Sequence, residues 1–247
     1  MTGFENQKTG SIVEHERLKH EHFLETGELH SEILGVVGEI PNPEELMGLK
    51  GGDFNFYDTS LFVSGDGEKI ELAPQEDPEE DAIEPERVLQ VLSPMVALLA
   101  RDFATRMDLP QGVNLKASVG GHTGIVEGIY PGDEIAEPHR DYIPDDQHFG
   151  IFYVASIGAP TKIWEGDFNI SESFNGGVES RQETERLLKE QVEEQGLVPT
   201  EIPASSVICI DSQTVHASPE ADLGVAGNER TFASIRFEVL TDGEMVE

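Results

Sequence analysis

Short strand-like runs separated by turn residues fill the last part of the chain and constrain its fold most. Residues 207–210 form a short apolar run of the kind found in buried strands, and Asp211-Ser212 then favours a turn. After a glycine-rich loop at 223–228, residues 230–239 alternate between two sets with a period of two. That alternation predicts a strand with two different faces. We therefore expect a β-rich core in this part of the molecule.

Metal-ligand residue types occur in two other segments that we expect to be extended. His139-Arg140-Asp141 follows a turn and enters one segment, and His216 lies on a short piece after the turn at Asp211. In an extended chain alternate side chains share a face, so His139 and Asp141 point one way and Arg140 points the other. Two histidines and one carboxylate are the ligand set of non-haem Fe(II) oxygenases, which leaves coordination positions open.

Two arginines lie downstream of the second histidine. Arg230 and Arg236 are six positions apart in the predicted strand, so both face the same side. The planar guanidinium group matches a carboxylate with two parallel hydrogen bonds. Either arginine is therefore a candidate to bind the far carboxylate of a 2-oxo acid.

The triplet has alternative interpretations that the surrounding sequence tests. A His-x-Asp triplet alone occurs by chance in many proteins, and a lone histidine such as His216 is often a core or loop residue. The letters HRD also occur in the catalytic loop of protein kinases, but residues 142–146 contain no asparagine where that motif requires one. The iron interpretation therefore depends on the context around both histidines.

That context resembles the Fe(II)/2-oxoglutarate-dependent dioxygenase superfamily. Tyr130-Pro131-Gly132 followed by His139-Arg140-Asp141 is similar to its prolyl-hydroxylase-like branch, and the block from Val207 to Arg236 is similar to the end of its core. The resemblance covers residues 126–239. It implies a mainly β fold with flanking helices, built on a double-stranded β-helix, which is a jelly-roll of the cupin type.

The resemblance also implies roles for individual residues. It implies that three residues bind Fe(II): His139, Asp141 and His216. Arg230 would pair with the distal carboxylate of 2-oxoglutarate, Tyr130 would hydrogen-bond that cosubstrate, and Arg236 is the rival for the arginine role. Because relatives that halogenate replace the carboxylate ligand by a small residue, Asp141 implies hydroxylation, or desaturation or cyclisation. The reaction would consume O2 and release succinate and CO2.

We expect one domain over residues 1–247, a size that allows a sizeable core. The jelly-roll would occupy residues 111–240, with an exposed, charged helical insertion around 179–196. Residues 1–110 would form a supporting region of helices and strands. Within it, Pro85 begins a helix whose wide apolar face should brace the outside of the sheet.

Three further local predictions rest on less regular spacing of apolar residues. Residues 11–35 have a loosely helical spacing of apolar residues among histidines and glutamates, which favours a solvated helix over a metal site. Residues 54–63 and 116–119 are expected to be strands, the second ending at Gly120-Gly121.

Charge and composition exclude several function classes. The chain has 49 acidic and 16 basic residues, a net charge of −33, so its surface should repel nucleic acids and anionic membranes. Such acidity is typical of a highly soluble protein, or of one adapted to a high-salt cytoplasm, where ions screen the repulsion between its own charges. The single cysteine, Cys209, is expected to fill space in the core. With neither a signal peptide nor a membrane span expected, we predict a cytoplasmic enzyme for a small soluble metabolite, such as a free or modified amino acid, with no nucleic-acid or membrane partner.

Two other classes remain open. A cupin-type metalloenzyme that uses no 2-oxo acid would keep the metal ligands but make Arg230 and Arg236 structural. A non-catalytic jelly-roll binding module would have histidines that bind no metal.

Overall fold

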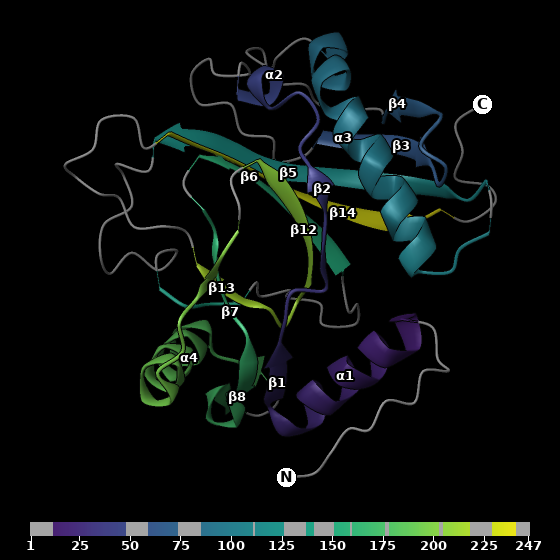
Figure 1. Cartoon of the computed structure of the whole chain (residues 1–247). Helices are drawn as coiled ribbons and strands as arrows, with labels where there is room; N and C mark the ends of the chain where they lie inside the picture. Colours follow the sequence, from purple (N-terminus) through teal and green to yellow (C-terminus); the bar gives the residue numbers. More distant parts are fainter. Residues whose placement is uncertain are drawn as a thin grey trace.

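The two largest β-sheets of the described residues face each other, and helices pack on their outer sides (Figure 1). The computed structural model describes residues 12–47, 59–73, 85–110, 112–125, 137–140, 151–158, 160–175, 178–202, 205–217 and 229–240. The strands pair antiparallel throughout these ranges. The prediction of a mainly β fold with flanking helices is therefore confirmed.

The larger sheet has seven strands and carries most of the core. In spatial order these are β2 (Gly35–Glu39), β12 (Ser206–Asp211), β6 (Ile151–Gly158), β14 (Glu229–Val239), β5 (Asn114–Ile125), β3 (Thr59–Ser64) and β4 (Ile70–Leu72). β14 pairs along its length with β5 and also with β6, so it joins the two halves of the sheet. Strands from the N-terminal part of the chain extend this sheet at both edges.

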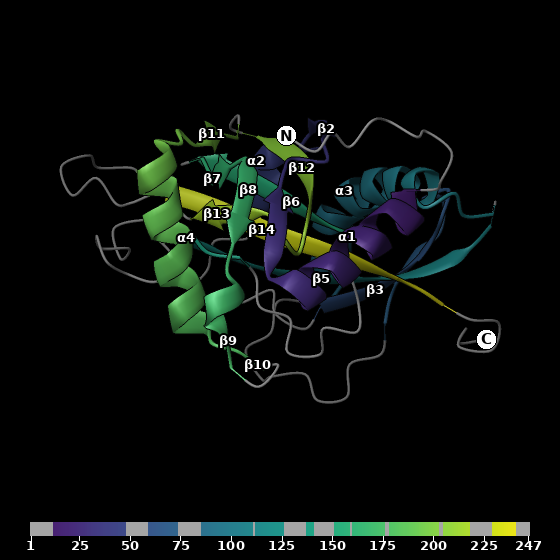
Figure 2. The same ribbon diagram turned by 90° about the horizontal axis from the view of Figure 1, so that it is seen from below.

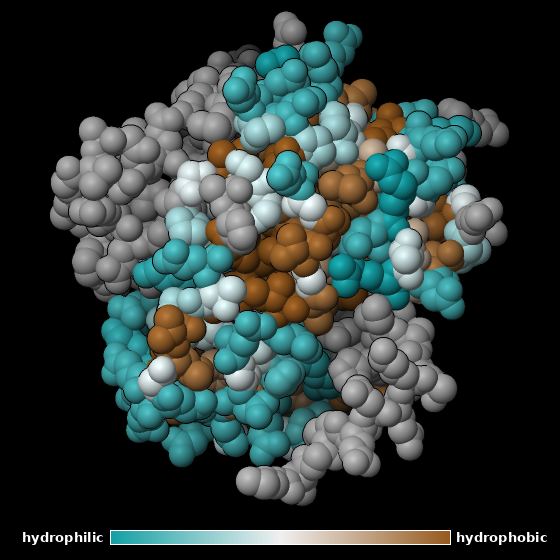
Figure 3. Space-filling model, in the orientation of Figure 1, coloured by the Kyte–Doolittle hydropathy of each residue, from teal (hydrophilic) through white to brown (hydrophobic). Residues whose placement is uncertain are grey.

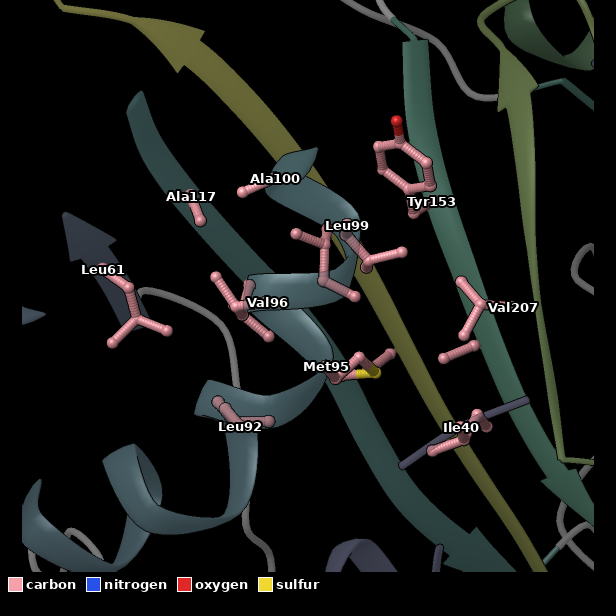
Figure 4. Packing of buried hydrophobic residues seen from close by; sticks show 14 of the residues in the cluster. Ile40, Leu61, Leu92, Met95, Val96, Leu99, Ala100, Ala117, Tyr153 and Val207 are labelled. Atoms are coloured by element: carbon pink, nitrogen blue, oxygen red, sulfur yellow. The ribbon is translucent and has the colours of Figure 1, made fainter. Parts of the chain in front are cut away.

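Helix α3 (Pro85–Arg106) covers the outer face of this sheet, as predicted. Figure 4 shows its apolar side chains, including Leu92, Met95 and Leu99, directed at residues of the sheet such as Ala117. A short helix, α2 (Pro43–Met47), packs beside α3. Burial of this continuous apolar face is the main stabilising contribution on this side of the molecule.

The smaller sheet contains β11 (Thr200–Glu201), β7 (Lys162–Trp164) and β13 (Val215–Ala217), in that order. An isolated bridge between His139 and His216 adds the His139 segment beside β13. A separate apolar cluster fills the space between the two sheets. Its members come from both sides: Phe152, Val154, Ile163, Ile202, Ile208 and Ile210. Two sheets facing each other across this cluster form the double-stranded β-helix.

A second layer covers the outer face of the smaller sheet. It consists of α1 (Ile12–Thr26), β1 (Glu28–Ser31), β8 (Gly166–Asn169) and α4 (Arg181–Gln195). Figures 1 and 2 show α1 and α4 on either side of the β1–β8 pair. Between β8 and α4 lie η3 (Ser171–Ser173), β9 (Phe174–Asn175) and β10 (Val178–Glu179).

Helix α4 differs from the predicted exposed insertion. It occupies the predicted residues, but Leu188 is fully buried and Val192 nearly so, in a cluster with Phe23 of α1 and Val215 of β13. These two apolar residues are four positions apart and therefore share one helix face. The high charge of the remaining faces obscured this narrow apolar stripe.

Two other local predictions were wrong in extent. The helix predicted in residues 11–35 ends at Thr26, and Glu28–Ser31 is a strand. The strand predicted at 116–119 runs from Asn114 through the glycine pair to Ile125, because pairing with β14 holds the backbone extended. Part of the strand predicted at 54–63 is confirmed as β3, whereas residues 54–58 lie outside the described ranges. No helix in the described ranges is both long and apolar enough to cross a bilayer.

Candidate functional site: a histidine pair on the smaller sheet

His139 and His216 lie side by side on adjacent extended segments. The amide of His139 donates to the carbonyl of His216 at 2.9 Å, and the amide of His216 donates back at 2.8 Å. The centroids of the two rings are 4.6 Å apart, with their planes inclined by 53°. Two residues that are far apart in sequence thus present their imidazoles together.

Both imidazole rings are oriented by the same kind of backbone contact. Nδ1 of His139 lies 2.9 Å from the carbonyl oxygen of Glu137, and Nδ1 of His216 lies 2.9 Å from the carbonyl oxygen of Thr214. A carbonyl oxygen can only accept, so each Nδ1 carries a proton, and in the neutral ring Nε2 then keeps its lone pair. This is the tautomer in which imidazole ligates a divalent metal through Nε2.

The turn that precedes His216 is made of buried polar residues. Asp211, Ser212, Gln213 and Thr214 are each at most 5% exposed. One carboxylate oxygen of Asp211 accepts hydrogen bonds from the amide of Gln213 at 2.9 Å and from the hydroxyl of Thr214 at 3.0 Å. The other is 2.5 Å from Nζ of Lys19, a residue of α1. Because each carboxylate oxygen has a partner, the turn has a fixed shape.

The pattern of burial tells which way the histidines face. Val215 and Ala217 are buried in the outer layer, beneath α1 and α4. His216 is opposite Ile163 in the β-ladder, and Ile163 belongs to the cluster between the two sheets. Because alternate residues of a strand face opposite sides, His216 lies on the inner face of the smaller sheet.

Arg140 follows His139 and turns to the outer side, as alternation predicts. Its guanidinium carbon is 4.7 Å from the centroid of the Phe23 ring, and one of its amino groups donates to the carbonyl of Ser212 at 3.4 Å. Arg140 is only 5% exposed. The residue between the two expected ligands is therefore held against α1.

The two candidate arginines occupy the inner-facing register of β14. Arg236 is opposite Phe152 of β6, and its guanidinium carbon is 5.3 Å from the centroid of that ring. Arg230 is opposite Gly158 at the other end of the same ladder, and the uninterrupted register gives it a position on the same face. For Arg230 the structure describes the backbone alone.

Two expected site residues, Asp141 and Tyr130, lie outside the described ranges. Among the residues that are described, no three His, Cys, Asp or Glu side chains group closely enough to hold a metal ion. The geometry therefore provides a pair of imidazole donors, and the third ligand remains a prediction from the His-x-Asp spacing.

Cys209 takes no part in this site. It is fully buried in the core on the α3 side of the larger sheet, where sequence analysis expected a space-filling residue. Burial raises the pKa of its thiol to about 12. The thiol is therefore protonated at neutral pH, which makes it neither a nucleophile nor a metal ligand.

Sequence reasoning missed Lys19 and the buried partners of Arg140. A charged residue at the surface and one buried in a tertiary contact look alike in sequence. The run Asp211-Ser212-Gln213-Thr214 was the available signal, since these residue types favour turns that bond their own backbone.

Comparisons with known proteins find distant matches among solved structures alone. No family model matches the chain, and no curated protein sequence matches it. Among solved structures, IDO from Bacillus thuringiensis is 12% identical, with 96% of this chain and 99% of that chain covered and a TM-score of 0.35. A Pseudomonas putida prolyl-4-hydroxylase is 13% identical, with coverage of 90% and 97% and a TM-score of 0.32. AviO1 from Streptomyces viridochromogenes Tue57 is 16% identical, with coverage of 94% and 97% and a TM-score of 0.36. At these values the likeness assigns no function.

Proposed function

We propose that this protein is an Fe(II)- and 2-oxoglutarate-dependent oxygenase that hydroxylates a C–H bond of a small soluble metabolite. The observation that carries the proposal is the pair His139 and His216, whose Nδ1 atoms both donate to backbone carbonyls. Each ring thereby offers a lone pair at Nε2 from the inner face of a jelly-roll.

The donor set suits iron. Two neutral imidazoles and one carboxylate, with Asp141 as the third ligand, hold Fe(II) while leaving room for a cosubstrate and O2. When bound, iron with 2-oxoglutarate and O2 supplies the oxidation of the substrate C–H bond, coupled to formation of succinate and CO2. The protein's own contribution is to orient the ligands, hold the cosubstrate and exclude water.

A positive charge on the inner face supports a dicarboxylate cosubstrate. We assign the distal carboxylate of 2-oxoglutarate to Arg230, because it lies at the start of β14, directly after Glu229, and keep Arg236 as the alternative. In this proposal Tyr130 donates a hydrogen bond to the same cosubstrate. A bidentate arginine–carboxylate pair is stronger than a neutral hydrogen bond.

The substrate class follows from charge and from the ligand set. A net charge of −33 disfavours nucleic-acid substrates, and a small metabolite such as a free or modified amino acid fits the enzyme better. Because Asp141 retains the carboxylate position, we propose hydroxylation as the outcome, with desaturation and cyclisation as related outcomes of the same hydrogen abstraction.

The test is an anaerobic Fe(II) titration followed by a metabolite screen scored by succinate release. The wild-type protein should bind one Fe(II) and release succinate with its substrate, and His139→Ala and His216→Ala should lose both properties. His22→Ala is the matched control, because its imidazole is 54% exposed on α1 and pairs with Glu28.

Each alternative class predicts a different result. Iron binding without any use of 2-oxoglutarate would instead support the cupin-type metalloenzyme. A protein that binds no divalent metal would support the binding module, and the oxygenase proposal would be abandoned.

A further inference from the structure

We infer that Arg140 is a positioning residue, which fixes the His139 segment against the turn that presents His216. This inference rests on the proposed metal site. It assigns a function to the residue between the two expected ligands in the His-x-Asp triplet, and to helix α1, which supplies no ligand.

Arg140 connects three parts of the molecule. It directly follows His139, it donates to the carbonyl of Ser212 in the turn before His216, and its guanidinium lies over the ring of Phe23 in α1. Arg140 and Phe23 are both buried, with exposures of 5% and 0%. A buried guanidinium held between a carbonyl and an aromatic face is costly to move, because displacement removes these two contacts from a charge that is shielded from water.

Helix α1 holds the same turn at a second point. Nζ of Lys19 is 2.5 Å from Asp211 and 3.3 Å from Glu32, and the Lys19 and Asp211 side chains are 10% and 6% exposed. Asp211 in turn bonds the amide of Gln213 and the hydroxyl of Thr214. The helix is thus tied to the start of the turn through Lys19 and to its second residue through Arg140.

These contacts reach the imidazoles through the backbone. The carbonyl of Thr214, at the end of the turn, accepts the Nδ1 proton of His216, and the amide and carbonyl of His139 pair with those of His216. Among the described residues one bridge joins the His139 segment to β13, and Lys189 of α4 pairs with Glu137 of the same segment at 2.8 Å. Arg140 adds an attachment directly beside His139, and partners of metal ligands typically alter metal affinity when they are removed.

The experiment measures Co(II) binding to the apo protein, followed by the visible absorption of the bound ion, which reports ligand geometry. Arg140→Met, which keeps an unbranched apolar stem but removes the guanidinium with its charge and donors, should weaken Co(II) binding by roughly 10-fold and shift the absorption bands. Arg140→Lys should recover part of the affinity. Arg186→Met is the matched control, because Arg186 is an exposed arginine on α4 paired with Glu183 and Glu190.

A second variant makes the test independent of the folding of Arg140→Met. Phe23→Leu keeps an apolar side chain in the cluster but removes the aromatic face, so it should also weaken Co(II) binding. If both changes act through the same contact, the double variant should be weaker than Arg140→Met alone by less than the factor found for Phe23→Leu.

The possible results separate this inference from the proposed function. A wild-type protein that binds neither Co(II) nor Fe(II) would overturn the proposed function. Normal binding by the wild type, with unchanged affinity and spectrum in folded Arg140→Met or in Phe23→Leu, would overturn the positioning role while leaving the metal site intact.

Discussion

At the scale of single residues, Arg230 and Arg236 are alternative candidates for binding the distal carboxylate of 2-oxoglutarate. We expect Arg230→Ala to raise the 2-oxoglutarate requirement by about 10-fold to 150-fold, since a charge-assisted pair contributes about 1.5–3 kcal/mol. Arg230→Lys should recover only part of this loss, because an ammonium group lacks the planar fork. The measurement is KM for 2-oxoglutarate beside KM for the primary substrate, with Arg236→Ala in parallel. A large effect in Arg236→Ala alone would transfer the role to Arg236.

A second residue-scale prediction concerns alkaline pH. Burial raises the pKa of the Cys209 thiol from an ordinary 9.0 to about 12, so above pH 9 the unfolded chain loses a proton that the folded protein keeps. The free energy of unfolding should therefore fall as pH rises from 9 toward 12, with a slope of up to about 1.4 kcal/mol per pH unit from this group. Urea titrations between pH 8 and 10 should show a smaller slope for Cys209→Ala. Parallel pH profiles for the two proteins would contradict the assignment.

The sequence predicted the histidine pair, but it did not predict the buried contacts of Arg140 that hold the pair in place. His139 and His216 stood out because ligand types recur at spacings that suit an extended chain, and the structure brings these two together. Arg140 was expected to point away, and it does. Its contact with Phe23 could not be foreseen, because α1 is more than a hundred positions earlier in the chain and its docking depends on tertiary packing.

At the scale of elements, the junction between α1 and β1 depends on Gly27. Its φ of +71° is unfavourable for other residues, and an added Cβ would lie 2.5 Å from the Cα of Ser171 in η3. Gly112 has a similar φ of +81° with nothing within 4 Å of an added Cβ, which makes it the matched control. Gly112→Ala should cost about 1–2 kcal/mol of stability from backbone strain alone.

Gly27→Ala should cost more than Gly112→Ala by roughly 1–3 kcal/mol, because the backbone of η3 must shift as well. Urea unfolding of both variants measures the difference. If Gly27→Ala and Gly112→Ala lose the same stability, the backbone of η3 can shift at no cost, and the junction is not tightly packed.

Elements with a strong periodic signal were predictable, and those defined by their neighbours were not. Helix α3 has a wide apolar face, and β12 is a short apolar run, so both were expected close to where they occur. Strand β5 continues through three glycines, which have little intrinsic preference for a strand, because β14 pairs with it residue by residue. The buried face of α4 escaped notice since apolar residues are few in that segment.

At the scale of the whole molecule, the net charge of −33 should make stability depend on salt. Figure 3 shows hydrophilic residues around a central apolar area on one face of the molecule. Some apolar side chains are exposed, among them Val36 of β2 at 62%. Salt shortens the range of charge repulsion from about 30 Å at 0.01 M to about 3 Å at 1 M. The midpoint of thermal unfolding should therefore rise with KCl, by about 2–4 °C for each kcal/mol of repulsion relieved.

The identity of the cation distinguishes screening from binding. A similar rise in choline chloride would identify general screening, whereas a rise in KCl alone would indicate bound potassium. A midpoint that is constant or lower at high salt would show that repulsion among the carboxylates is not a major cost of folding.

The position of β14 has a consequence for synthesis of the chain. β5 and β6 are made early, yet both pair with β14, which begins at Glu229, 71 positions after the last residue of β6, Gly158. At about 5–20 residues per second, a ribosome needs roughly 4–14 s to cover that distance. Until β14 is made, β5 and β6 each keep an unpaired edge, and such edges are the surfaces that other nascent chains would join. The net charge of −33 should make copies of the chain repel one another, and we expect this repulsion to oppose such pairing until β14 is made.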